Sequence, residues 1–212
     1  MKKSIWIVVI IIVAGIITGG LSVFIKDFSH FDSGEYIRDE SKVTNVLVLC
    51  YSRNGNTEAM AKEIAKQYNT ELQFIEADAY SRDREGWRNA GRDADAHTES
   101  PIEPMVYDMK DYDLVFIGSP IWWYRPAPPL WTFVKNNDFT DKKVVLFSTF
   151  NSRFKQEDID EFSNLISSKG GTMVDHIYIK RGRAIPVFQR NGNYVIKKTK
   201  RLLEENEEKW NN

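Results

Sequence analysis

The chain has 212 residues, a net charge of −1 at pH 7 and 42% hydrophobic residues. This small net charge gives no indication of nucleic-acid binding, and the single cysteine excludes both an internal disulfide framework and a metal site of clustered thiolates. Beyond its first 40 residues or so the chain keeps about 170, enough for one domain with a substantial core.

Residues 1–25 are predicted to be a membrane anchor. Lys2 and Lys3 precede a segment, Ser4 to Ile25, that contains no charged residue. At 1.5 Å per residue these roughly 22 residues span about 30 Å, the thickness of one hydrocarbon core. A cleaved signal peptide is the alternative, but it would have a shorter apolar region and a small-residue cleavage site. We therefore expect an uncleaved single-pass helix with its N-terminus in the cytoplasm.

The basic N-terminus favours an extracytoplasmic position for the rest of the chain, although Arg38 and Lys42 on the other flank reduce the asymmetry. Residues 26–42 are polar and are interpreted as a tether. The remaining residues, 43–212, are predicted to form one domain.

A buried strand, a short polar loop and a helix are predicted from residue 43 to residue 68. Residues 46–49 form a continuous apolar run, as in a strand covered on both faces. The loop then leads into a helical pattern from Glu58 to Tyr68, whose first backbone N–H groups can bind an anion. Gly55 can adopt positive φ and let the backbone approach a ligand. The expected phosphate-binding residues are Ser52, Arg53, Asn54, Gly55, Asn56 and Thr57.

Other phosphate-binding patterns are excluded at this loop. It contains neither the G-x-x-x-x-G-K-[ST] pattern of ATP-binding loops nor the G-x-G-x-x-G pattern of dinucleotide-binding folds. A phosphatase thiolate at Cys50 would need an arginine six residues on, where the chain has Asn56. We therefore expect a monophosphate held by uncharged donors, with Arg53 as further help.

The loop Y-S-R-N-G-N-T at residues 51–57 resembles the phosphate loop of flavodoxins, which bind flavin mononucleotide (FMN). This resemblance implies an FMN cofactor and a flavodoxin-like doubly wound parallel sheet of five strands in the order 2-1-3-4-5.

After the second predicted strand, residues 72–75, comes a charged stretch from Asp78 to Met109. We interpret it as a solvated excursion with a short helix near residues 85–93. The alternative is a lid whose Tyr80 or Trp87 touches a ligand. The three histidines have no neighbours at metal-ligand spacing and are interpreted as surface residues: His30, His97 and His176.

The third predicted strand, residues 114–118, leads into a loop with four prolines around three consecutive aromatic residues. We expect the prolines to end the strand and stiffen the loop. Adjacent rings cannot all face one core, so at least one should face a ligand, a partner or a membrane, unless the rings simply cap the core. A helix should begin near Pro129 and continue through Phe133.

The same stretch, G-S-P-I-W-W with its prolines, Phe133 and the D-K-K-V segment at 141–144, resembles the flavodoxin-like subfamily whose third loop contacts the flavin ring. The resemblance places flavin contacts at Pro120, Ile121, Trp122, Trp123 and Tyr124. The strand lacks the terminal aspartate of a response-regulator receiver, which shares the expected topology.

The last third of the chain should supply two strands, 144–150 and 176–179, with a helix at 159–166 between them and a terminal helix at 194–210. The loop after the first of these strands, residues 149–154, should face the ligand, with contacts at Thr149, Phe150 and Asn151. The loop is bulkier than is usual in the family. Asn191-Gly192 is expected to be a turn, in a small hairpin with residues 185–188. Two arginines are expected either to lie in a solvated turn or to attract an anionic partner: Arg181 and Arg183.

Parallel strands alternating with helices place their ligand beyond the carboxyl ends of the strands, where the strand order reverses. The chain is therefore predicted to be an FMN-binding, flavodoxin-like protein that carries electrons at a membrane, to a redox partner protein or a small-molecule acceptor. The alternatives are an FMN-dependent NAD(P)H or quinone oxidoreductase and a flavin-free scaffold. No catalytic side chain and no metal ligand is predicted.

Overall fold

The computed structural model describes residues 2–182 and 190–211. Its strands are β1 (Val46–Tyr51), β2 (Glu71–Ile75), β3 (Leu114–Trp122), β4 (Arg125–Pro126), β5 (Lys143–Phe150) and β6 (Thr172–Lys180). Its α-helices are α1 (Lys2–Phe28), α2 (Asn56–Tyr68), α3 (Arg84–Asp95), α4 (Pro128–Asn136), α5 (Gln156–Ser168) and α6 (Gly192–Asn211), with a 3₁₀ turn η1 (Asp78–Tyr80).

The sheet has the order β2-β1-β3-β5-β6, with these five strands parallel, and β4 pairs antiparallel to the end of β3. The predicted order of the five parallel strands is confirmed. The predicted total is wrong by one strand, because the two-residue β4 had no apolar run to indicate it.

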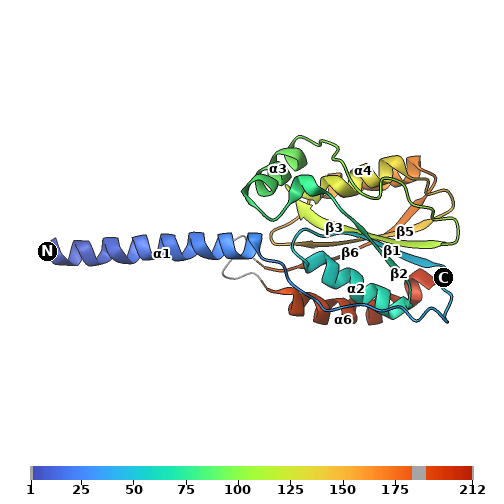
Figure 1. The fold of residues 1–212 in the computed structure, drawn as a ribbon, viewed down its shortest axis with the longest axis horizontal. Helices are drawn as coiled ribbons and strands as arrows, with labels where there is room; N and C mark the ends of the chain where they lie inside the picture. The colour runs from blue at the N-terminus through green and yellow to red at the C-terminus, as the bar shows by residue number, and fades with distance from the viewer. Residues whose placement is uncertain (1, 183–189, 212) are drawn as a thin grey trace.

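Helices cover both faces of the sheet (Figure 1). The side chains of β1 alternate between the faces, as the pleat requires. Leu47 and Leu49 join a core cluster with residues of α4 and α5, while Val46 and Val48 join one with residues of α2 and α6. Both faces are therefore buried, which explains the continuous apolar strands in the sequence.

The third strand is longer than predicted. We expected the prolines to stop it after Gly118, but β3 continues to Trp122, and Pro120 pairs in register with Thr149 of β5. The pairing of β3 with β1 ends at Gly118. Beyond that point β3 has a parallel partner on one side only, and a strand edge tolerates the missing N–H of a proline.

A two-residue turn joins β3 to β4. Its central residues both have positive φ, 46° at Trp123 and 75° at Tyr124. Two-residue hairpin turns favour such angles because they match the strand twist, but the positions are usually taken by Asn and Gly. Bulky aromatic residues in this conformation are strained, and such strain is concentrated at functional sites.

The charged stretch after β2 forms a capped helix. Asp83 accepts a hydrogen bond from the backbone N–H of Gly86 at 2.8 Å, which caps the N-terminus of α3. Ala90 and Ala94 are buried, while most of the charged side chains face outward. The predicted short helix is confirmed, and its small buried residues let it pack closely over η1 and α4.

Helix α1 has 27 residues and extends away from the domain (Figure 1). Its described large apolar side chains are exposed: Ile5, Trp6, Ile7, Val8, Val9, Ile10, Ile11, Ile12, Val13, Ile16 and Ile17. The predicted transmembrane anchor is nevertheless not supported. Over the residues that the structure describes, no helix is both long enough and apolar enough to cross a bilayer.

Candidate functional site

A cavity of about 260 Å³ lies at the carboxyl ends of β1, β3 and β5. The loops after these three strands converge on it, as predicted from the parallel topology. The predicted site residues that line it are Ser52, Arg53, Asn54, Asn56, Thr57, Pro120, Ile121, Trp122, Trp123, Thr149, Phe150 and Asn151. Gly55 and Tyr124 are not among the lining residues.

The N-terminus of α2 forms the polar end of the cavity. Gly55 precedes the helix with φ of 76°, and no described side chain caps the helix there. The first backbone hydrogen bond of this turn runs from the N–H of Ala59 to the carbonyl of Gly55. The N–H groups before Ala59 and the positive end of the helix dipole therefore remain available to an anion.

Three polar atoms around the cavity are suited to binding a polar ligand. Within the described part of the chain, Ser52 Oγ, Asn56 Oδ1 and Asn151 Oδ1 are buried and have no hydrogen-bond partner. Leaving a buried polar group unpaired costs about 1–3 kcal/mol, so folded proteins rarely leave three such atoms side by side. A ligand with both donors and acceptors would satisfy them.

Two of the three loops are joined directly across the cavity. The hydroxyls of Thr57 and Thr149 lie 2.8 Å apart, and both residues are almost completely buried. This hydrogen bond fixes the first turn of α2 against the end of β5.

Arg53 lines the cavity and also makes contacts that the sequence did not indicate. Its Nε and Nη2 donate to the backbone carbonyls of Tyr80 and Ser81 at 3.1 and 3.0 Å, and Nη2 also reaches the carbonyl of Asp83 at 3.4 Å. The side chain thus ties the phosphate-type loop to the segment that leads into α3. A direct contact between Arg53 and a phosphate stays a prediction.

The other end of the cavity is aromatic. Trp122 packs edge-on against Tyr51 and Tyr80, with ring centroids 5.6 and 5.3 Å apart, and forms a rigid wall. Trp123 and Trp87 line the cavity with 48% and 46% of their surface exposed. Trp87 belongs to α3, so the charged stretch reaches the cavity there, whereas Tyr80 is buried against Trp122 and does not line this cavity. Contact of Trp87 with a ligand stays a prediction.

A close contact positions Trp123. A Cβ atom on Gly91 of α3 would lie 2.7 Å from Cη2 of the Trp123 ring. The missing side chain at Gly91 therefore makes room for the ring, and it places α3 over the hairpin. Ser152 lines the cavity within the loop 149–154 that was expected to face it. Sequence reasoning missed Ala90 as a lining residue, because an alanine carries no chemical signal of its own.

Two of the side chains interpreted from the sequence are less accessible than expected. Cys50 is fully buried, and burial raises the pKa of its thiol well above the usual value, which agrees with the exclusion of a thiolate nucleophile. His176 is not a surface residue. Its Nε2 lies 2.8 Å from Ser148 Oγ, and burial lowers its pKa to about 4.

Arg181 lines the cavity, and its backbone N–H donates to the carbonyl of Phe150 at 2.7 Å. Arg183 and residues 185–188 of the expected hairpin lie outside the described residues. The turn expected at Asn191-Gly192 is instead the start of α6, which begins at Gly192. Among the residues that are described, no group of three acidic, histidine or cysteine side chains could hold a metal ion.

Comparisons with known proteins agree with this fold. A family model described as Flavodoxin matches residues 45–204. A proposed flavoprotein from Bacteroides uniformis ATCC 8492 has a similar structure, with a TM-score of 0.54 and 20% identity, over 75% of this chain and 99% of that one.

A flavoprotein from Lactobacillus acidophilus NCFM, solved in complex with FMN, is similar with a TM-score of 0.52 and 23% identity, over 64% of this chain and 93% of that one. At these identities the two likenesses establish the fold. A search of the curated proteins found no match.

Proposed function

Because the chain belongs to the flavodoxin family, we propose that it binds FMN in the cavity between the β1, β3 and β5 loops and carries electrons at a membrane. FMN is the cofactor of this family, and the residues present fit it. The observation that carries the proposal is the set of buried, unpaired polar atoms, Ser52 Oγ, Asn56 Oδ1 and Asn151 Oδ1.

The chemistry of FMN matches this donor set. A phosphate accepts hydrogen bonds, which suits the Ser52 hydroxyl and the N–H groups at the start of α2. The ribityl hydroxyls and the flavin N–H can donate, which suits the two asparagine oxygens. The uncharged donors hold the phosphate without a buried cation, and so without its desolvation cost.

When bound, the flavin supplies the redox chemistry, while this chain orients the ring and controls its surroundings. Trp122 is held in place by Tyr51 and Tyr80 and gives the ring a rigid apolar wall. Trp123 and Trp87 line the cavity with half-exposed rings, and these would shield a bound flavin from water.

Anchoring by α1 is the membrane part of the proposal. The exposed apolar side chains from Ile5 to Ile17 have no protein surface to cover them among the described residues. Phe31, three residues after α1 ends, donates its N–H to the carbonyl of Asn54 in the cavity loop at 2.9 Å. Anchoring at α1 would therefore keep the flavin near the bilayer, within reach of membrane-bound partners.

This anchoring is tested by extracting membranes that contain the full chain with alkaline carbonate. We expect the protein to stay with the membranes, and the Val8→Lys/Ile12→Lys double variant to be released, because charges in an apolar segment that lies in lipid are costly. Release of the unaltered chain would contradict the anchor and leave the FMN proposal intact.

The cofactor is tested by purifying the full chain in mild detergent, recording its visible spectrum and titrating the apoprotein with FMN. We expect a flavin spectrum, with FMN fluorescence changed on binding as the ring meets the tryptophans. Failure to bind FMN at high micromolar concentrations would overturn the proposal and favour a flavin-free scaffold.

A second candidate function is that of an FMN-dependent NAD(P)H or quinone oxidoreductase. The observation that favours it is Arg181, a cationic side chain that lines the cavity beside the exposed tryptophans and could attract an anionic substrate. Adding NADPH without oxygen separates the two functions. Rapid bleaching of the flavin indicates the oxidoreductase, whereas a flavin that is reduced only by a partner or by dithionite indicates the carrier.

A further inference from the structure

Residues 29–42, which we call the strap, are packed along α2. Near the middle of the helix, Lys62 Nζ donates to the carbonyl of Gly34 at 2.5 Å. At the end of the helix, the Tyr36 hydroxyl donates to the carbonyls of Ala65 and Thr70 at 3.1 and 2.7 Å. The strap therefore follows α2 from its first turn to its last.

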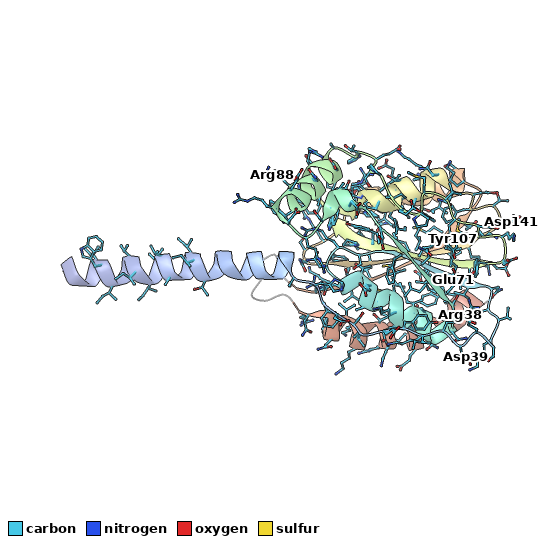
Figure 2. The ribbon with its side chains drawn as sticks, viewed as in Figure 1. Arg38, Asp39, Glu71, Arg88, Tyr107 and Asp141 are labelled. Carbon is cyan, nitrogen blue, oxygen red and sulfur yellow. The ribbon has the colours of Figure 1, made fainter. Side chains whose placement is uncertain are left out.

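The far end of the strap is held at the opposite end of the domain from α1. Asp39 and Asn69 exchange two hydrogen bonds of 2.9 and 2.8 Å between side chain and backbone. Arg38 lies 3.9 Å from Glu71 at the start of β2. Figure 2 shows Arg38, Asp39 and Glu71 grouped at this end. The segment expected to be a tether is thus attached along its length.

The near end of the strap is built onto the cavity loop. The N–H of Phe31 donates to the carbonyl of Asn54 at 2.9 Å, and Asn54 Nδ2 donates to the carbonyl of Ser29 at 3.2 Å. A Cβ atom on Gly55 would lie 2.0 Å from the carbonyl oxygen of Phe31. Gly55 therefore must lack a side chain for two reasons, its φ of 76° and the strap pressed against it.

Phe31 is also held from the other side. A Cβ atom on Gly192, where α6 begins, would lie 2.0 Å from Cδ1 of the Phe31 ring. The Phe31 ring therefore lies against the first residue of α6, while the Phe31 backbone is hydrogen-bonded to the cavity loop. On the far side of the same loop, Arg53 fixes it to the backbone before α3. The loop is braced from both flanks.

We propose that Phe31 is a positioning residue for the cofactor phosphate, and that docking of the strap and binding of the phosphate stabilise one another. The inference rests on the proposed FMN site. The backbone N–H groups that meet the phosphate belong to the residues directly after Asn54, so their direction depends on the conformation that Phe31 imposes. By thermodynamic linkage, if docking tightens phosphate binding, the phosphate must tighten docking by the same factor.

The test compares FMN with riboflavin, which has the same ring and no phosphate. In the full chain, Phe31→Ala should weaken FMN binding about tenfold, or about 1.4 kcal/mol, and leave riboflavin binding unchanged. A general loss of packing would weaken both ligands alike, so the ratio of the two dissociation constants isolates the positioning role. Equal loss for both ligands, or no loss for FMN, would overturn the inference.

Tyr36→Ala is the matched control. It truncates an aromatic side chain of the same strap at the end of α2 that is remote from the loop. We expect it to lower stability and to leave the FMN-to-riboflavin ratio unchanged. A ratio that falls as far as in Phe31→Ala would show that the whole strap, rather than Phe31, sets phosphate binding, and would overturn the assignment to this residue.

A second measurement needs no variant. Hydrogen exchange of the unaltered chain should show the Phe31 amide, which donates to Asn54, more strongly protected with saturating FMN than with saturating riboflavin. Equal protection would contradict the linkage. A chain that binds neither ligand would overturn the proposed function itself, whereas normal FMN binding with an unchanged ratio in Phe31→Ala would overturn only the strap inference.

Discussion

Thr57 and Thr149 show how single residues hold the site together. Their hydroxyls pair at 2.8 Å, and both residues are almost completely buried. On folding, each hydroxyl loses its hydrogen bonds to water and gains one to the other hydroxyl. The pair therefore contributes to stability mainly because neither buried group is left without a hydrogen bond.

Replacing Thr57 with valine should lower the unfolding free energy of the apoprotein by about 1–3 kcal/mol, because the Thr149 hydroxyl would be buried without this partner. Denaturant titration without FMN measures the change. The double variant Thr57→Val/Thr149→Val should recover part of the loss, since it leaves neither hydroxyl unpaired. A double variant that is less stable than the sum of the single changes would contradict this account.

His176 makes stability depend on pH. Burial holds its folded-state pKa at about 4, against about 6.5 in the unfolded chain. As the pH falls from about 6.5 to about 4, His176 therefore becomes protonated in the unfolded chain but stays neutral in the folded chain. The contribution is fully present above pH 6.5 and is lost between about pH 6.5 and 4.

We expect the loss over this window to be about 3 kcal/mol, at 1.36 kcal/mol for each pH unit between the two pKa values. Unfolding free energies measured from pH 7 to pH 4 should fall less steeply in His176→Gln, which cannot titrate and can keep a hydrogen bond to Ser148. Parallel pH profiles for the two proteins would show that His176 is not the group responsible.

At the scale of elements, the turn between β3 and β4 has a strained backbone and also contributes to the cavity wall. Trp123 contributes to the cavity wall, whereas Tyr124 does not line the cavity and lies near two cationic side chains, 5.2 Å from the Arg153 guanidinium carbon and 5.5 Å from Lys155 Nζ. Both have positive φ. The strain is therefore accepted at a place where it directs the Trp123 ring to the cavity wall.

The variant Trp123→Asn/Tyr124→Gly has the residues that such a turn favours. It should raise the unfolding free energy of the apoprotein by about 1 kcal/mol, since relief of strain outweighs the lost ring contacts, and it should weaken FMN binding. Tyr124→Gly alone is the control and should leave FMN affinity unchanged. An unchanged affinity in the double variant would remove Trp123 from the site.

Helix α3 and the strap are the two elements that distinguish this domain from a bare sheet with covering helices. One brings Trp87 and Ala90 over the cavity, and the other braces the loop from the opposite flank. Arg88 of α3 lies at the end of the domain from which α1 extends, so α3 and α1 share that end of the molecule (Figure 2).

At the scale of the whole molecule, the cavity connects three strands, and its ligand should stabilise the domain as a unit. FMN at a hundredfold excess over its dissociation constant should raise the unfolding free energy by about 2.7 kcal/mol. For a domain of this size that is an increase in melting temperature of about 5–10 °C. Thermal scans at rising FMN concentration measure it, and a melting temperature independent of FMN would contradict binding to the native state.

Much of this architecture follows from local sequence. The apolar runs of β1, β3 and β5 are buried on both faces, and their continuity alone indicates parallel strands. The polar glycine loop before α2 and the proline-rich aromatic loop after β3 can be recognised from a few consecutive residues. Most of the predicted site residues therefore line one cavity, because each loop follows a strand whose end the topology already determines.

The contacts between segments that are distant in sequence were decided by the tertiary structure alone. Continuation of β3 through Pro120 depends on where β1 stops, and the task of Arg53 depends on carbonyls about 30 residues further along the chain. The close approaches at Gly55 and Gly91 depend on the strap and on a tryptophan ring. Local propensity acts over a few residues, whereas these contacts form only after the chain has packed, so no short stretch of sequence carries them.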